Sequence, residues 1–277
     1  MSSDIKTTDN YLWQKEIERH RVGVVVACRM KSSRLKKKAI LPIAGVPSVE
    51  RCLQNCLRFP YAGVVVLATS TLEDDAVLKD YTLGGKVKFW RGAPDDVIKR
   101  YLGACEEFNI DVVIRVTADC PVVSPEIAEY LLQSHFETGA DYTGPNKYAV
   151  GSNSEIYNVS ALRRVIELLG QADYSEYMTW YMLNNPHVFK VNIVDLPSDY
   201  IRDYRLTLDY LEDLEMFERL YAALEAKGMT PGIKNVFKIL DANPDIAALN
   251  EHLTMKYRAD QDLIDKLNRV TRIEIDK

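Results

Sequence analysis

The chain has 277 residues, with 35 basic and 40 acidic side chains and a net charge of −5 at pH 7. With 47% hydrophobic residues it has the composition of a folded globular protein, which excludes disorder over most of its length. No apolar run approaches the roughly 18 residues of a membrane span, and the polar start lacks the apolar segment of a signal peptide. We therefore expect a cytoplasmic protein with no membrane partner. The acidic balance also argues against nucleic acid as a partner, because that binding comes largely from neutralised phosphates.

The five cysteines form no Cys-x-x-Cys pair, and the four histidines lie far from them in the sequence. This spacing does not favour a zinc site or a disulfide framework. Cys52 and Cys56 fall on the apolar stripe of an amphipathic helix, and free cysteine is among the most buried residue types. We interpret both as core thiols.

Short β-rich runs alternate with amphipathic helices from residue 22 onward, beginning with the continuous apolar run VGVVVA. Such a run is typical of a strand that is covered on both faces. A later helix is marked by Ser124 as N-cap, Pro125 at its first position and Gly139 as terminator. The alternation predicts an α/β fold with a mainly parallel sheet flanked by helices. The predicted strands are 22–27, 63–69, 86–90 and 111–117, and the predicted helices are 47–58, 73–81, 95–108 and the one that follows Ser124.

Beyond residue 140 the pattern is less regular and then becomes mainly helical. We expect residues 1–20 to form a short helical extension and residues 21–277 a single domain. This domain would include a small inserted β element and a helical C-terminal segment from about residue 211. The predicted elements here are strands at 154–159, 189–195 and 204–209, with helices near 160–169 and 173–184.

A strongly basic segment, CRMKSSRLKKKAI, directly follows the first predicted strand. It could be a solvated loop, but open α/β sheets bind their ligands at the carboxyl ends of strands, which favours a polyphosphate site. Arginine can hold two phosphate oxygens at once and lysine adds a compact charge. Arg29, Arg34 and Lys38 are therefore candidates for holding a triphosphate and neutralising a departing pyrophosphate. The glycine patterns of dinucleotide-binding and P-loop proteins are absent from the sequence.

Two aspartates end or follow predicted strands: Asp119 in RVTADCP and Asp209 in YRLTLDYLED. Two carboxylates delivered to the same edge of a sheet could converge on Mg²⁺, which takes one or two protein carboxylates and completes its shell with phosphates and water. Either aspartate could instead be a turn residue or a helix N-cap.

Several successive blocks of the chain resemble the cytidylyltransferase family that includes CMP-Kdo and CMP-sialic acid synthetases. The similarity is greatest to its spore coat polysaccharide biosynthesis protein F branch and covers about residues 22–250. The blocks are RMKSSRLKKKAILPIAGVP, VLATSTLEDDA, FWRGAPDDVIKRY, RVTADCPVVSPEI, LTLDYLEDLE and LDANPDIAALN.

The resemblance implies a Rossmann-like nucleotidyltransferase that moves CMP from CTP to a small sugar acceptor and releases pyrophosphate. It also implies a Mg²⁺ requirement, a homodimer and a role in making surface polysaccharide or glycoconjugate. By motif position it implies triphosphate contacts for Arg29, Arg34 and Lys38, and metal binding by Asp119 and Asp209. The other implied sites are nucleotide contacts at Ala27, Cys28, Ala68, Thr69, Arg91, Arg115 and Asp119, and acceptor contacts at Asn153 and Glu155.

The chain departs from the family pattern at a few positions. Lys31 stands where glycine is usual, and Lys36 and Lys37 replace Pro-Gly, so the loop loses backbone freedom as it gains charge. In the part of the site implied to hold the acceptor, Asn153 replaces aspartate and Tyr177 replaces histidine. The sequence therefore leaves the acceptor open between a sugar acid and a sugar phosphate. Two other readings also stay open: a nucleotide-binding relative without activity, and a nucleotide-sugar-dependent glycosyltransferase.

Overall fold

The structure is a computed structural model that describes residues 13–253 and 260–274. Its frame is a seven-stranded sheet in the order β5-β4-β1-β6-β8-β7-β9, accompanied by the small hairpin β2-β3. The strands β5, β4, β1 and β6 are parallel, and β8 pairs antiparallel with β6 and with β7. The strands are β1 (Val22–Ala27), β2 (Pro42–Ile43), β3 (Val46–Pro47), β4 (Val64–Ser70), β5 (Lys88–Gly92), β6 (Val112–Thr117), β7 (Tyr142–Pro145), β8 (Glu155–Asn158) and β9 (Val191–Val194).

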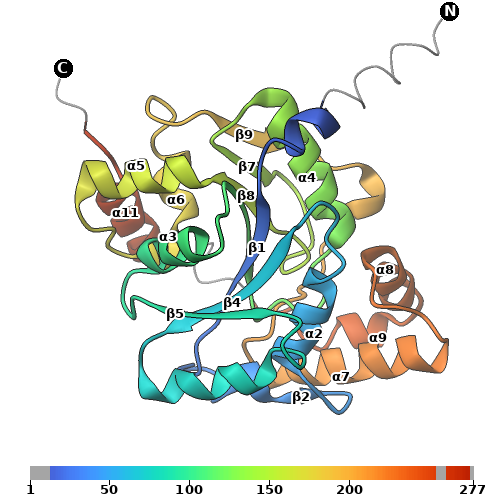
Figure 1. The fold of residues 1–277 in the computed structure, drawn as a ribbon. Helices are drawn as coiled ribbons and strands as arrows, with labels where there is room; N and C mark the ends of the chain where they lie inside the picture. Colours follow the sequence, from blue (N-terminus) through green and yellow to red (C-terminus); the bar gives the residue numbers. More distant parts are fainter. Residues whose placement is uncertain (1–12, 254–259, 275–277) are drawn as a thin grey trace, which may run out of the picture.

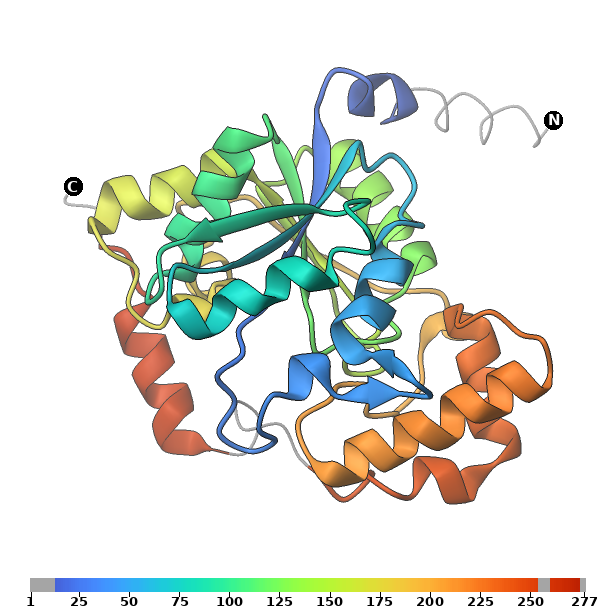
Figure 2. The same ribbon diagram turned by 60° about the horizontal axis from the view of Figure 1, so that its bottom comes forward.

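Helices cover both faces of the large sheet (Figure 1). In both views α8 and α9 lie beside α7, at the edge of the molecule where the hairpin β2-β3 contacts α7 (Figures 1 and 2). No described helix is both long enough and apolar enough to cross a bilayer. The helices are α2 (Ser48–Cys56), α3 (Val97–Glu107), α4 (Pro125–Thr138), α5 (Val159–Leu169), α6 (Thr179–Leu183), α7 (Leu211–Ala226), α8 (Ile233–Ala242), α9 (Pro244–Ala247) and α11 (Gln261–Val270), with short 3₁₀ helices η1 (Lys38–Ile40), η2 (Glu73–Tyr81), η3 (Ser175–Tyr177) and η4 (Ser198–Tyr200).

The two faces of the sheet form two apolar cores, as the continuous apolar run of β1 predicts. Val24 and Val26 point into the core shared with α2, α4, α7 and α8, whereas Val25 points into the core shared with α3, α5 and α6. Successive side chains of a strand alternate between faces, so a strand that is covered on both sides must be apolar throughout. From the first twenty residues, Trp13 and Ile17 are also buried in the first of these cores.

Most of the predicted elements are confirmed, including the doubly covered parallel sheet. Ser124 caps α4 by accepting a hydrogen bond from the backbone of Ile127, and Gly139 ends that helix in the left-handed conformation. Cys52 and Cys56 are fully buried core thiols, as predicted. The predicted helix at 73–81 is a 3₁₀ helix, the helix predicted near 173–184 is divided into η3 and α6, and the sequence reading missed β7.

The strand predicted at 204–209 is wrong. Only an isolated bridge between Val150 and Arg205 forms there. The segment is extended, and the backbone N–H groups of Leu206 and Leu208 donate to the carbonyls of Val150 and Asp119, which lie outside the strands. Its alternating apolar side chains therefore reflect packing against loops, not membership of the sheet.

Candidate active site

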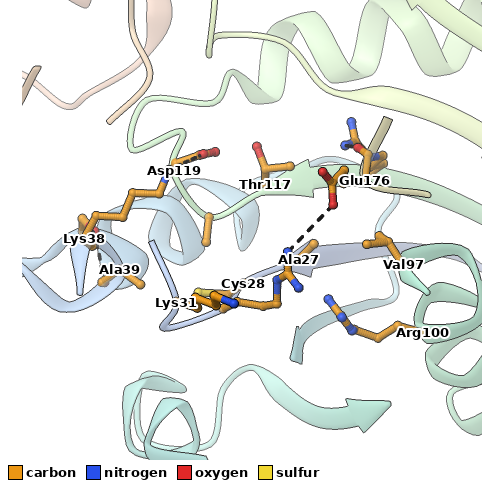
Figure 3. Close-up of a pocket in the computed structure, with 14 residues that line it drawn as sticks. Ala27, Cys28, Lys31, Lys38, Ala39, Val97, Arg100, Thr117, Asp119 and Glu176 are labelled. Carbon is orange, nitrogen blue, oxygen red and sulfur yellow. Dashed lines mark hydrogen bonds and ion pairs between the residues drawn. The ribbon is translucent and has the colours of Figure 1, made fainter. Parts of the chain in front are cut away.

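A cavity of about 240 Å³ opens at the carboxyl ends of β1 and β6. β1 lies between β4 and β6, so the order of the strands reverses here, and open α/β sheets bind ligands at such a point. Figure 3 shows Lys38 reaching toward Asp119 on one side of the cavity, Thr117 between, and Glu176 with Arg100 on the other side. The lining residues are Ala27, Cys28, Arg29, Lys31, Lys38, Ala39, Ser48, Val97, Arg100, Arg115, Thr117, Ala118, Asp119 and Glu176.

The basic loop 28–40 is anchored at its start by a buried carboxylate. Asp75 accepts a hydrogen bond from the backbone N–H of Met30 at 2.7 Å and another from the hydroxyl of Ser70 at the end of β4. Arg29 follows directly, donates to the carbonyl of Pro94 at 3.3 Å and lines the cavity. The loop thus leaves β1 along a fixed path that brings its cations to the cavity wall.

Lys38 bridges the two aspartates that the sequence singles out. Its Nζ lies 2.7 Å from Oδ2 of Asp119 and 2.8 Å from Oδ1 of Asp209. Arg34 donates to the same oxygen of Asp209 at 2.7 Å. The backbone under Lys38 is held by Ser48, whose hydroxyl donates to the Lys38 carbonyl at 2.7 Å. Three residues that are far apart in the sequence therefore meet at one small cluster of charge.

Electrostatics keeps Lys38 and Asp119 ionised. Burial alone would raise the pKa of Asp119, but the charge of Lys38 and its hydrogen bond lower that pKa to about 2. Burial alone would likewise lower the pKa of Lys38, but the two aspartates outweigh it and raise the pKa. At neutral pH the Asp119 carboxylate and the Lys38 ammonium therefore carry full charge.

A buried ion-pair network of Arg205 and Asp213 positions Asp209. Arg205 donates to Oδ2 of Asp209 at 3.1 Å and to both carboxylate oxygens of Asp213, at 2.8 Å and 3.0 Å. Asp213 also accepts the backbone N–H groups of Asp209 and Tyr210. Asp209 is not the N-cap of α7, because Tyr210 occupies that position and Asp213 completes a capping box with it. The capping interpretation of Asp209 is therefore excluded.

Half-buried Arg115 on β6 forms a second ion pair, with the buried Glu155 on the neighbouring strand β8. The guanidinium of Arg115 lines the cavity and donates to Glu155. Glu155 does not line the cavity: its carboxylate also accepts hydrogen bonds from the hydroxyls of Tyr142 at 2.7 Å, Thr179 at 2.6 Å and Tyr157 at 3.3 Å. Burial alone would lower the pKa of Arg115, but Glu155 outweighs it and raises the pKa. Glu155 thus stands behind Arg115.

Four further residues that the resemblance implies as ligand contacts do not line the cavity: Ala68, Thr69, Arg91 and Asn153. Ala68 and Thr69 are fully buried at the end of β4. Arg91 donates to the carbonyls of the three residues 70–72 and so braces the loop after that strand. Asn153 is half-buried in the loop before β8.

The sequence did not predict several of the residues that line the cavity. Arg100 is 1% exposed, yet its guanidinium borders the cavity and donates to the carbonyls of Ala93 and Pro94. It sits inside a predicted amphipathic helix, where spacing gives no sign that its long side chain reaches a strand end. Glu176 was missed because it follows an irregular stretch, and no motif marked it.

The donor set around Lys38 fits a hard divalent cation. Mg²⁺ needs only one or two protein carboxylates, provided that phosphate and water complete its octahedron. Asp119 and Asp209 supply two such carboxylates. They come from two separate segments, and both contact the Lys38 ammonium. Within residues 13–253 and 260–274 no group of three or more His, Cys, Asp or Glu could hold a metal by itself. A metal here would therefore depend on oxygens that a ligand brings.

Comparison with known proteins points to a single family. A family model described as cytidylyltransferase matches residues 23–238. The spore coat polysaccharide biosynthesis protein SpsF of Bacillus subtilis (strain 168) is 29% identical over 235 residues, which cover 82% of this chain and 97% of SpsF. A 3-deoxy-manno-octulosonate cytidylyltransferase of Chlorobium luteolum is 25% identical over 198 residues, 72% of this chain and 69% of that protein.

Solved structures share the fold. A cytidylyltransferase from Leptospira borgpetersenii superposes with a TM-score of 0.73 at 23% identity, covering 85% of this chain and 99% of that one. A CMP:2-keto-3-deoxy-manno-octonic acid synthetase, solved as a complex with CTP, gives a TM-score of 0.58 at 17% identity, covering 73% and 98%. The Rossmann-like fold predicted from the sequence is confirmed by these likenesses.

Proposed function

Because the chain belongs to the cytidylyltransferase family, and is thus a CTP-dependent nucleotidyltransferase, we propose that it transfers CMP from CTP to a small sugar acid or sugar phosphate. The observation that carries this proposal is the cluster in which Lys38, from a basic loop, bridges Asp119 and Asp209 beside the cavity. A polyphosphate with its divalent cation needs this combination of cations and paired carboxylates in one place.

In the proposed reaction an acceptor oxygen attacks the α-phosphorus of CTP in line with the departing pyrophosphate. The new oxygen–phosphorus bond forms as the bond from the α-phosphorus to the bridging oxygen breaks. Arg29, Arg34 and Lys38 bind the triphosphate and neutralise the charge that builds up on the leaving group. Asp119 and Asp209 would hold Mg²⁺, which when bound polarises the phosphoryl oxygens. Positioning and electrostatics carry such transfers, so no covalent enzyme intermediate is required.

The class of acceptor rests on two kinds of support. One is the names of the relatives, which concern polysaccharide biosynthesis and 3-deoxy-manno-octulosonate. The other is the charge of the cavity: Arg100 stands with Glu176 on the side away from Asp119, and Arg115 also lines the wall. An acceptor carrying a carboxylate or phosphate would find complementary charge there. A role in surface polysaccharide or glycoconjugate synthesis, in the cytoplasm and as a homodimer, completes the proposal.

The first test is a thermal-shift panel of CTP, UTP, GTP and ATP, each with and without Mg²⁺, because a ligand that binds the folded state raises its stability. We expect a shift that is selective for CTP and larger with Mg²⁺. Pyrophosphate release is then measured across sugar acids and sugar phosphates. No shift with any nucleotide would refute the proposal.

Variants test the assigned residues. Asp119→Asn and Asp209→Asn should each abolish Mg²⁺-dependent pyrophosphate release, since each removes a charged ligand. Asp245→Asn is the matched control, because this carboxylate is 73% exposed on a distant helix. Release of a nucleoside diphosphate would indicate a glycosyltransferase instead, and CTP binding without turnover would indicate an inactive relative.

A further inference from the structure

Lys38 lies between Asp119 and Asp209, the two carboxylates proposed above to hold Mg²⁺. Its ammonium is within hydrogen-bonding distance of one oxygen from each carboxylate, at 2.7 Å and 2.8 Å. The side chain is only 17% exposed, so little water screens these contacts. A lysine ammonium is a compact point charge, and in this respect it resembles a small metal ion.

The carboxylate oxygens around this point are already satisfied by protein groups. Oδ1 of Asp209 accepts hydrogen bonds from both Lys38 and Arg34, and Oδ2 accepts from Arg205. The negative charges of Asp119 and Asp209 are neutralised by Lys38 and Arg34. The positive charge of Arg205 is neutralised by Asp213. Adding Mg²⁺ to this arrangement would leave two uncompensated positive charges and would push the metal against the Lys38 ammonium.

A triphosphate changes this balance. Its oxygens offer Lys38 and Arg34 new acceptors, and its negative charge compensates the metal. Lys38 can respond through its side chain alone, because Ser48 fixes its backbone and its stem already lines the cavity. The movement needed is therefore a rotation of a flexible four-carbon chain toward the space where the nucleotide would lie.

We propose that Lys38 holds the divalent cation position in the nucleotide-free protein, so that the metal enters only as a triphosphate draws Lys38 away. The site is thereby closed to free divalent cations and opens to a metal that arrives with its nucleotide. This inference rests on the proposed function for the identity of the nucleotide. The claim about the nucleotide-free protein depends on Lys38 and the two carboxylates alone.

The test measures Mn²⁺ binding to the nucleotide-free protein by electron paramagnetic resonance, with Mn²⁺ as the probe for an oxygen-binding divalent cation. The wild type should bind Mn²⁺ weakly. Lys38→Met removes the ammonium and keeps most of the apolar stem, and we expect it to bind Mn²⁺ about 5- to 150-fold more tightly, the range of ordinary coupling between two ligands of one site. Lys38→Met should therefore gain metal binding although it lacks a side chain assigned to the triphosphate.

Two further variants locate the effect. Lys36→Met removes an exposed cation from the same loop and should change Mn²⁺ affinity by less than about twofold, because surface charge effects are small. Asp209→Asn in the Lys38→Met background should abolish the gain. Thermal unfolding confirms that each variant is folded, and Lys38→Gln replaces Lys38→Met if the latter is not.

The outcomes separate the two proposals. Tight Mn²⁺ binding by the nucleotide-free wild type overturns the inference, as does an equal gain in Lys36→Met or a gain that survives Asp209→Asn. If the wild type binds CTP and releases pyrophosphate while Lys38→Met shows no gain, the proposed function stands and this inference fails. If Lys38→Met gains Mn²⁺ binding but the wild type binds no nucleotide, the place of Lys38 is upheld and the proposed function fails.

Discussion

Replacing Asp213 with alanine should destabilise the protein by about 3 kcal/mol, since breaking a buried ion pair costs about 3–5 kcal/mol. The carboxylate is fully buried and accepts two hydrogen bonds from Arg205, at 2.8 Å and 3.0 Å. It also accepts the side-chain amide of Asn250 and the backbone N–H groups of Asp209 and Tyr210. One side chain therefore ties the start of α7 to the segment that carries the candidate metal ligand.

The magnitude follows from what the substitution leaves behind. Arg205 is 8% exposed and would keep Asp209 as an acidic neighbour at 3.1 Å, which compensates part of its charge. We therefore take the lower end of the range for a broken buried pair. Adding up the individual hydrogen bonds, at about 1.5–3 kcal/mol each when one partner is charged, would count the same desolvation several times.

The assay is urea unfolding at neutral pH, compared between wild type, Asp213→Ala and a control. Asp245→Ala removes an exposed carboxylate that lies 3.9 Å from Arg219, and it should cost less than about 0.5 kcal/mol. Adding Arg205→Met to Asp213→Ala should recover part of the loss, because the uncompensated charge is removed. A loss below about 1 kcal/mol for Asp213→Ala would refute this account of the network.

Three other predictions concern the rest of the fold. Burial lowers the pKa of His135 to about 4, although the hydrogen bond that its Nε2 donates to Oδ1 of Asn158 works in the opposite direction. Stability is therefore complete above pH 6.5 and falls by up to about 3 kcal/mol between pH 6.5 and pH 4, and His135→Gln should flatten that slope in urea unfolding. Lys37 has φ of 56°, a conformation that costs a residue with a side chain about 1–2 kcal/mol and costs glycine nothing. Thermal unfolding should therefore find Lys37→Gly more stable than Lys37→Ala by about 1 kcal/mol, and equal stabilities would contradict this strain. Gly151→Ala should prevent normal folding, because a Cβ there would lie 2.0 Å from the carbonyl oxygen of Leu206; a soluble variant with wild-type circular dichroism would show the close approach to be wrong.

The class of fold and the position of the basic loop could be predicted from the sequence alone. Strands that are buried on both faces are apolar over most of their length, so the valine-rich runs of β1, β4 and β6 identify the parallel sheet directly. The end of β1 is then a ligand-binding edge, and the unusual run of cations after it needs no tertiary information to be noticed. The N-cap at Ser124 and the terminator at Gly139 are equally local, because they depend on neighbouring backbone groups.

The alternating pattern of residues 204–209 gave a wrong strand prediction, because packing against loops produces the same alternation as a strand. Leu206 and Leu208 alternate with polar residues as in a half-buried strand, and both are fully buried. Their backbone partners, however, lie in the loops around Val150 and Asp119. The alternation therefore predicted the buried side chains correctly, but the prediction of a strand was wrong. A hydrophobic period does not specify which backbone groups will be available for pairing.

Which charged side chains meet depends on the tertiary structure. Lys38 contacts Asp209 across 171 residues of sequence and Asp119 across 81, and these separations follow from the order of the strands and the path of the extended segment. The same holds for Glu155, which sequence similarity implied as an acceptor contact and which lies behind Arg115 in a pocket of hydroxyl donors. A residue's type and its flanking pattern set what it can bind. Its actual partner depends on long-range packing, since the free energy of a buried charge is fixed by the groups that the whole fold brings around it.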